Sequence, residues 1–127
     1  MRGQAALEYL LLSALALSLI LFSASALSGM KDSAQKNAEM LSFRSDALSL
    51  ADAMGEICAL GDGNGRELSL SAELSIESEN TDEGVLVRFS SKNATLVRRF
   101  YCNVEDATLS GTVYVENEKG VLVFRGR

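Results

Sequence analysis

The feature that most constrains this chain is an uncharged apolar segment close to its N-terminus. Between Tyr9 and Met30 the only ionisable group is the Tyr9 phenol, and most residues are Leu, Ala, Ser or Ile. A helix over this run would be about 33 Å long, close to the hydrocarbon thickness of a bilayer. Because a segment in lipid must satisfy its backbone hydrogen bonds internally, the pattern predicts a membrane-inserted helix.

A charged residue, Glu8, stands at the entrance to this segment. A carboxylate at the centre of a spanning helix costs about 2.5–3.5 kcal/mol, so an ionisable residue in such a helix indicates a function. The residues around it form the pattern Arg2-Gly3-Gln4-x-Ala6-x-Glu8-x-x-x-Leu12.

This pattern resembles the class III (prepilin-type) signal of archaeal type IV pilins, over the first dozen residues and the apolar run. Ala6 departs from the family pattern, which usually has Ser there. The resemblance implies that a membrane prepilin peptidase removes residues 1–3 by cutting between Gly3 and Gln4 on the cytoplasmic side. The helix would then stay on the mature protein, and Glu8 would take part in assembly.

The resemblance further implies where the protein acts and with what. The precursor would reside in the cell membrane and meet a pilus assembly platform. The mature chain would form a homo-oligomeric extracellular filament through its N-terminal helices, by default a pilus for adhesion.

Two other interpretations of the N-terminus stay open. Arg2, the apolar run 9–22 and the small residues Ala24-Ser25-Ala26 fit an ordinary secretory signal, which would leave Leu27 as the first mature residue. The run also suits a plain single-span anchor. In both cases the function would be that of a secreted or membrane-tethered small β binding domain. Neither alternative explains Glu8 or the Gly3-Gln4 pair.

Composition argues against several classes of function. The 127 residues carry a formal net charge of −5, which argues against a nucleic-acid-binding surface. The run Arg98-Arg99-Phe100-Tyr101 mixes cations and aromatic rings, but strand alternation would divide these residues between two faces. The chain has no His, which removes Ser-His-Asp and Cys-His catalysis and His-containing zinc sites. We therefore expect no enzyme, cofactor or metal site.

Helical periodicity continues beyond the apolar segment and predicts one long helix over 4–60. Two apolar lines follow it, which suggests packing on both the chain's own sheet and neighbouring helices; a single broad core-facing stripe is the alternative. The first line comprises Ala34, Ala38, Leu41, Leu48 and Ala51, and the second comprises Met40, Phe43, Ala47, Leu50, Met54 and Ile57.

Three glycines between Gly61 and Gly65 end the helix, and we assign 61–66 as a joint. Asp62 and Asn64 faintly resemble a calcium loop, but Arg66 occupies a position where an oxygen ligand is needed.

After the joint, the hydrophobic period changes to two, which predicts strands in a head domain over 67–127. The expected strands are 68–77, 85–90, 95–102, 108–116 and 121–124, and short loops make neighbouring strands antiparallel. The sequence thus predicts an α+β fold, in which a long N-terminal helix packs on a small antiparallel sheet of four or five strands.

Cys58 and Cys102 are the only cysteines, one at the end of the helix and one at the end of a strand. In an exported protein they would form a disulfide that staples helix to sheet; two buried free thiols are the alternative. No Cys-x-x-Cys motif supports redox catalysis.

Asn93-Ala94-Thr95 is an N-glycosylation sequon at an expected hairpin tip. Asn93 is therefore a candidate glycan site. The alternative is a turn residue that tolerates left-handed backbone.

Overall fold

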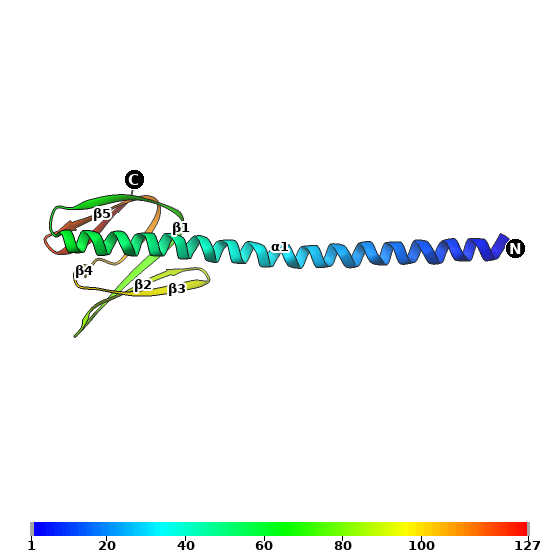
Figure 1. The fold of residues 1–127 in the computed structure, drawn as a ribbon, viewed down its shortest axis with the longest axis horizontal. Coiled ribbons are helices and arrows are strands. Elements are labelled where there is room, and N and C mark those ends of the chain that lie inside the picture. Colours follow the sequence, from blue (N-terminus) through cyan, green and yellow to red (C-terminus); the bar gives the residue numbers. More distant parts are fainter. Residues whose placement is uncertain (1, 127) are drawn as a thin grey trace. The chain divides into compact units, whose positions relative to one another are not determined.

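The computed structural model describes residues 2–126 and has the predicted α+β fold, a long helix followed by a β-sheet (Figure 1). The elements are α1 (Arg2–Leu60), β1 (Gly65–Thr81), β2 (Gly84–Ser91), β3 (Ala94–Phe100), β4 (Asn103–Val104), β5 (Ala107–Glu118) and β6 (Val121–Gly126). The described chain divides into two compact units, an N-terminal helical segment that ends at Ala38 and a head that begins at Glu39.

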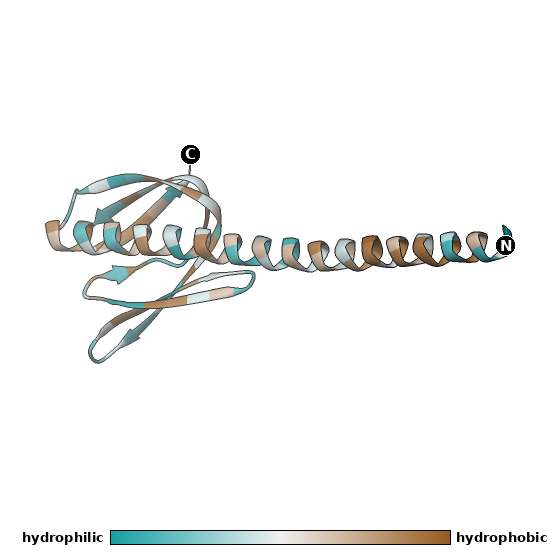
Figure 2. Ribbon diagram, turned by 45° about the vertical axis from the view of Figure 1, so that its right-hand side comes forward, coloured by the Kyte–Doolittle hydropathy of each residue, from teal (hydrophilic) through white to brown (hydrophobic). Residues whose placement is uncertain are grey.

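The N-terminal helical segment is apolar over most of its length, as the hydropathy colouring shows (Figure 2). Its large hydrophobic side chains from Leu7 to Met30 are exposed within the chain. By its length and composition, the helix that contains this segment could cross a membrane. The segment therefore has an apolar surface that the chain itself does not cover.

The head contains a six-stranded sheet with the order β3-β2-β1-β5-β6-β4. Strands that are neighbours in the sheet are antiparallel, except that β4 and β6 are parallel. The prediction of four or five strands, all antiparallel, was therefore wrong in these two details. The additional strand, β4, has two residues, too few for any period-two pattern in the sequence.

The sheet curls so that its two edges approach each other. β3 and β4 are its outermost strands, yet only Tyr101 and Cys102 separate them in the chain. Three Cα–Cα steps span at most about 11 Å. The edges of a flat six-stranded sheet would instead be about 24 Å apart. The chain can close this connection only because the sheet wraps around the C-terminal half of α1.

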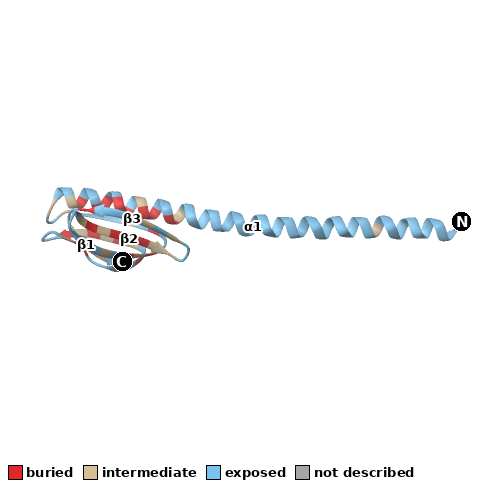
Figure 3. Cartoon of the chain, turned by 90° about the horizontal axis from the view of Figure 1, so that it is seen from below, coloured by how far each residue is buried: buried red, intermediate tan, exposed pale blue. Residues whose placement is uncertain are grey.

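The head core lies between this half of α1 and the concave face of the sheet. In Figure 3 the buried residues of α1 are on the side that faces the strands. The second apolar line supplies this side, except that Met40 is 55% exposed. The first line divides, because Leu41 is 69% exposed whereas Ala51 is buried. The buried members of the core on α1 are Phe43, Ala47, Leu50, Ala51, Met54 and Ile57.

A β-bulge in β1 breaks the predicted alternation at Ala72, which is exposed rather than buried. Leu70 pairs with Gly111 on β5 and Leu74 pairs with Leu109, so β1 has two extra residues between these pairs. Residues in a bulge lose their ladder partners. Two N–H groups of this bulge bond instead to a carboxylate on α1.

That carboxylate belongs to Asp46, which is 8% exposed. Its Oδ2 accepts hydrogen bonds from Ser71 N at 2.7 Å and from Ala72 N at 3.3 Å. The Ser71 hydroxyl donates to Oδ1 at 3.4 Å. Asp46 thus accepts hydrogen bonds from two N–H groups of the bulge and joins α1 to β1 by polar contacts. These bonds explain why an acidic residue is buried on the core side of the helix.

We expect Asp46→Ala to lower the free energy of unfolding of the head by about 1–2 kcal/mol, because it leaves two amide donors without their acceptor. Asp46→Asn keeps one acceptor oxygen and should have a smaller effect. Amide hydrogen exchange at Ser71 and Ala72 measures the change directly. Asp52→Ala, an exposed acid on the same helix, is the control; unchanged exchange in Asp46→Ala would contradict this role.

The helix ends at Leu60, where Gly61 has a φ of 86°. The Asn64 amide donates to Leu60 O and to Gly61 O, both at 3.1 Å, and so satisfies two carbonyls at the helix C-terminus. β1 begins at Gly65, which pairs with Glu116 on β5. The segment between helix and sheet is therefore 61–64, shorter than the predicted joint 61–66.

Candidate functional site

The residues of the N-terminal motif lie in the first turns of α1. Gly3, Gln4 and Glu8 are all helical and exposed within the chain. A Cβ added at Gly3 would meet no heavy atom within 4 Å. The structure therefore leaves this motif accessible to other molecules on the N-terminal helical segment.

Four serine hydroxyls of the apolar segment are satisfied inside the helix. Ser13 donates to Tyr9 O at 2.8 Å, and Ser25 donates to Leu21 O at 3.0 Å. Ser18 and Ser23 make the same bond to the carbonyl four residues earlier. Serines bonded in this way need no external partner. The segment can therefore enter apolar surroundings with these polar groups already paired.

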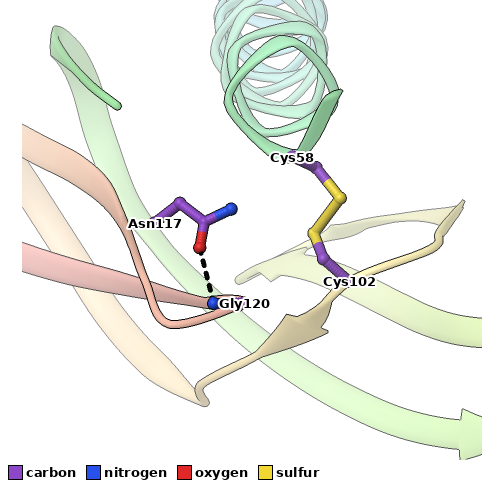
Figure 4. The surroundings of a disulfide bond; sticks show 4 residues. All are labelled: Cys58, Cys102, Asn117 and Gly120. Carbon is purple, nitrogen blue, oxygen red and sulfur yellow. Dashed lines mark hydrogen bonds between the residues drawn. A yellow bond between two sulfur atoms is a disulfide. The ribbon is translucent and has the colours of Figure 1, made fainter. Parts of the chain in front are cut away.

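The Cys58–Cys102 disulfide is present, as predicted (Figure 4). The two Cα atoms are 6.0 Å apart and the cysteines are separated by 44 positions in the sequence. Cys58 is in the last turn of α1, and Cys102 lies in the two-residue link between β3 and β4. The bond thus ties the helix to the point at which the two edges of the curled sheet meet.

The segment 61–64 is held against the β5–β6 hairpin. Asn117 is 2% exposed, and its backbone N–H donates to Asn64 O at 2.9 Å while its carbonyl accepts from Gly63 N at 2.8 Å. Its side-chain Oδ1 accepts from Gly120 N at 2.9 Å (Figure 4). Asp62 Oδ1 accepts from Lys119 N at 2.6 Å. Asp62 and Asn64, the residues that resemble a calcium loop, therefore make bonds that position this segment.

The turn of this hairpin uses left-handed backbone. Lys119 has a φ of 55° and Gly120 a φ of 86°, between the paired residues Glu118 and Val121. Two positive φ values in a two-residue loop are typical of a type I′ turn, which matches strand twist. The turn aligns the Lys119 and Gly120 amides with their side-chain acceptors.

A groove of about 830 Å³ lies between α1 and the segment that runs from β3 to β4. Asp52, Gly55 and Ala59 are on its helical side, and Arg98, Tyr101 and Asn103 are on the other. The disulfide also lines it. Sequence reasoning identified Arg98 and Tyr101 within a mixed run but gave no sign that they would lie opposite the helix, because the two sides are about forty positions apart in the sequence.

The four residues of the Arg98–Tyr101 run have different environments, although all four line the groove rather than being divided between two faces as predicted. Phe100 is buried and packs edge-to-face on Phe89 with ring centroids 6.4 Å apart. Arg99 pairs with Glu83 at 2.8 Å. Arg98 has no hydrogen-bond or ion-pair partner within residues 2–126, and Tyr101 is 88% exposed. Arg98 and Tyr101 are therefore available to a ligand.

Asn93 lies exposed in the turn between β2 and β3, at the predicted hairpin tip. Lys119 is the one non-glycine residue with positive φ in the described chain, so Asn93 does not use left-handed backbone. The alternative explanation for this Asn, a left-handed turn position, was wrong.

Asp106 fastens the chain after β4 to β1. Its Oδ1 accepts from the Ser78 hydroxyl at 2.8 Å and from Ser78 N at 2.7 Å. These two hydrogen bonds hold the pKa of the Asp106 carboxyl below its ordinary value, because they favour the charged form. The Asp106 carboxylate thus joins the segment after β4 to β1 through both Ser78 hydrogen bonds.

Comparisons of the chain with known protein families, with curated proteins and with solved structures found no match.

Proposed function

We propose that this protein is the structural subunit of an extracellular type IV pilus-like filament, made as a membrane precursor and assembled through its N-terminal helix. The single observation that carries the proposal is the difference in burial between the two parts of α1. Residues from Phe43 onward bury one face in the head core, whereas the large hydrophobic side chains of the N-terminal helical segment are exposed within the chain. A large exposed apolar surface needs lipid or other protein to cover it.

Three further features support the same proposal. The head closes its own core, so the N-terminal helical segment is not needed to complete it. The disulfide suits a head exported to an oxidising compartment. The motif around Glu8 is exposed on the first turns of α1, as cleavage between Gly3 and Gln4 by a membrane prepilin peptidase would require. Membrane lipid would cover the apolar surface before assembly, and the helices of other copies would cover it afterwards.

The first mature residue separates this proposal from its rival. Intact mass and N-terminal sequencing of protein recovered from the cell surface should give Gln4 as the first residue. Leu27 would instead indicate an ordinary secretory signal and a secreted β binding domain, and an unprocessed chain would indicate a simple anchor. Either result would overturn the filament proposal.

Gly3→Val is expected to block processing, because a branched side chain next to the scissile bond hinders entry into a peptidase that accepts glycine. The variant should accumulate in the membrane as unassembled precursor, visible by its slower electrophoretic mobility. Gly29→Val is the matched control, since Gly29 is also helical with no heavy atom within 4 Å of an added Cβ. Normal filaments from Gly3→Val would count against the proposed processing.

A further inference from the structure

We propose that the groove between α1 and the β3–β4 segment is a binding site for a neutral saccharide. This inference does not depend on filament assembly, because every residue that lines the groove belongs to the head. With a volume of about 830 Å³, the groove falls in the size range of small-molecule sites. One or two hexose rings are of suitable size for such a space.

The charges that line the groove favour a neutral ligand. Asp52 and Asp62 present carboxylates, which disfavour an anion. Arg98 and Arg99 present guanidinium groups, which disfavour a cation. Arg99 pairs with Glu83, whereas Arg98 has no ion-pair partner in the described chain. An uncharged ligand avoids both repulsions and can still bond to every one of these groups.

The hydrogen-bonding groups of the groove are mixed in a way that suits hydroxyl groups. Arg98 is only a donor, an ionised Asp52 is only an acceptor, and the Asn103 amide is both. Each hydroxyl of a sugar both donates and accepts, so neighbouring hydroxyls can satisfy all three side chains. A hydrocarbon ligand would leave these groups without bonds, which is unfavourable once water is displaced.

Tyr101 supplies the apolar surface that a sugar ring needs. It lines the groove and is 88% exposed, although Phe100 beside it is buried. One face of a pyranose ring presents mainly C–H groups, which pack well on an aromatic face. On the opposite side Gly55 has no side chain and Ala59 has only a methyl group, so the ring can approach the helix closely.

The groove is held in shape before any ligand arrives. The disulfide connects its two sides directly, and Asn117 anchors the hairpin that forms one end of it. Preformed geometry reduces the entropy lost on binding. The structure thus combines the features of a saccharide site: a fixed groove, one free aromatic ring and complementary hydrogen-bonding groups.

Saturation-transfer difference NMR on the full-length chain tests this proposal. The chain should be held in a zwitterionic detergent, because sugar-based detergents would compete for the groove. The probes are the methyl glycosides of glucose, galactose and mannose, with glucuronate and trialanine for comparison. We expect transfer to ring C–H protons of at least one neutral glycoside at about 10 mM, a concentration suited to weak binding.

Variants of Tyr101 test whether a neutral glycoside binds in this groove. Because the side chain is exposed, Tyr101→Ala should leave the head folded yet weaken binding about tenfold through loss of the stacking surface. Tyr101→Phe keeps the ring and should bind within about threefold of the parent chain. Val97→Ala removes a half-exposed apolar residue of β3 outside the groove and should bind as the parent does.

Each of four results would overturn the proposal. These are no transfer to any neutral glycoside, equal binding by Tyr101→Ala, transfer to glucuronate alone, and transfer to trialanine alone. The last two would identify an anion site or a peptide site in place of a saccharide site. Filament formation has no bearing on any of them, so the saccharide site and the filament can fail separately.

Discussion

Removing the Cys58–Cys102 disulfide is expected to lower the free energy of unfolding of the head by about 4 kcal/mol, from the loop-closure entropy of a bond that spans 44 positions. The effect is large because the bond joins segments that little else connects. β4 has two residues, and β3 and β4 are not neighbours in the sheet. Without the bond, the two edges of the curled sheet can separate from α1.

Urea unfolding of the full chain, followed by aromatic circular dichroism with and without reductant, measures this effect. Cys58→Ala/Cys102→Ala should unfold at the same urea concentration as the reduced parent chain and should not respond to reductant. Intact mass after alkylation confirms the redox state of each sample. An oxidised parent chain that unfolds at the same urea concentration as the double variant would contradict the prediction.

Glu8→Ala is expected to be inserted and cut between Gly3 and Gln4, yet to give few or no filaments. Cleavage would create an ammonium group on Gln4, one helical turn before Glu8. In a filament, the ammonium of one copy could meet the Glu8 carboxylate of another in apolar surroundings. At about 4 Å and an effective dielectric constant near 20, the attraction is about 4 kcal/mol.

The expected role of this pair is selection of register rather than net stability. Desolvation offsets much of the attraction between two buried charges, whereas an unpaired buried carboxylate is strongly unfavourable. Only arrangements of helices that neutralise Glu8 should therefore form. A pair within one subunit, between Gln4 and its own Glu8, is the competing explanation, since residues four apart are neighbours on a helix.

Processing and assembly are measured separately in this experiment. The mobility shift of the precursor reports cleavage, and filaments sheared from cells report assembly. Glu8→Gln retains the shape and removes the charge, so it should fail as Glu8→Ala does. Asp32→Ala, an exposed acid later in the same N-terminal helical segment, should assemble normally. A correctly processed Glu8→Ala subunit that yields normal filaments would show that the carboxylate does not guide assembly.

Much of the fold could be predicted from the sequence, because its main elements have strong local signals. The helical period continues to Ile57, and the glycines at 61–65 stop it. The period-two pattern after Leu68 then identifies the long strands. The disulfide followed from the cysteine count together with the expectation of export, since two cysteines allow one intramolecular bond. Antiparallel pairing followed from short loops, except at β4.

The candidate groove could not be predicted, because no local pattern reports which distant segments face each other. Arg98 and Tyr101 were recognised only as members of a mixed run, and Asp52 was not singled out. Their proximity depends on the curl of the sheet, which brings the β3–β4 link next to the last turns of α1. That curl results from packing the whole concave face around one helix.

The sequence by itself determined the long helix, the order of the longer strands and the apolar N-terminal helical segment, because these depend on the spacing of residues along one element. Tertiary structure alone decided the remainder. It placed Asp46 against the bulge of β1, exposed Ala72 and brought β3 and β4 together at Cys102. Each of these depends on hydrogen bonds or packing between residues that are more than twenty positions apart, and their positions are set only when the core closes.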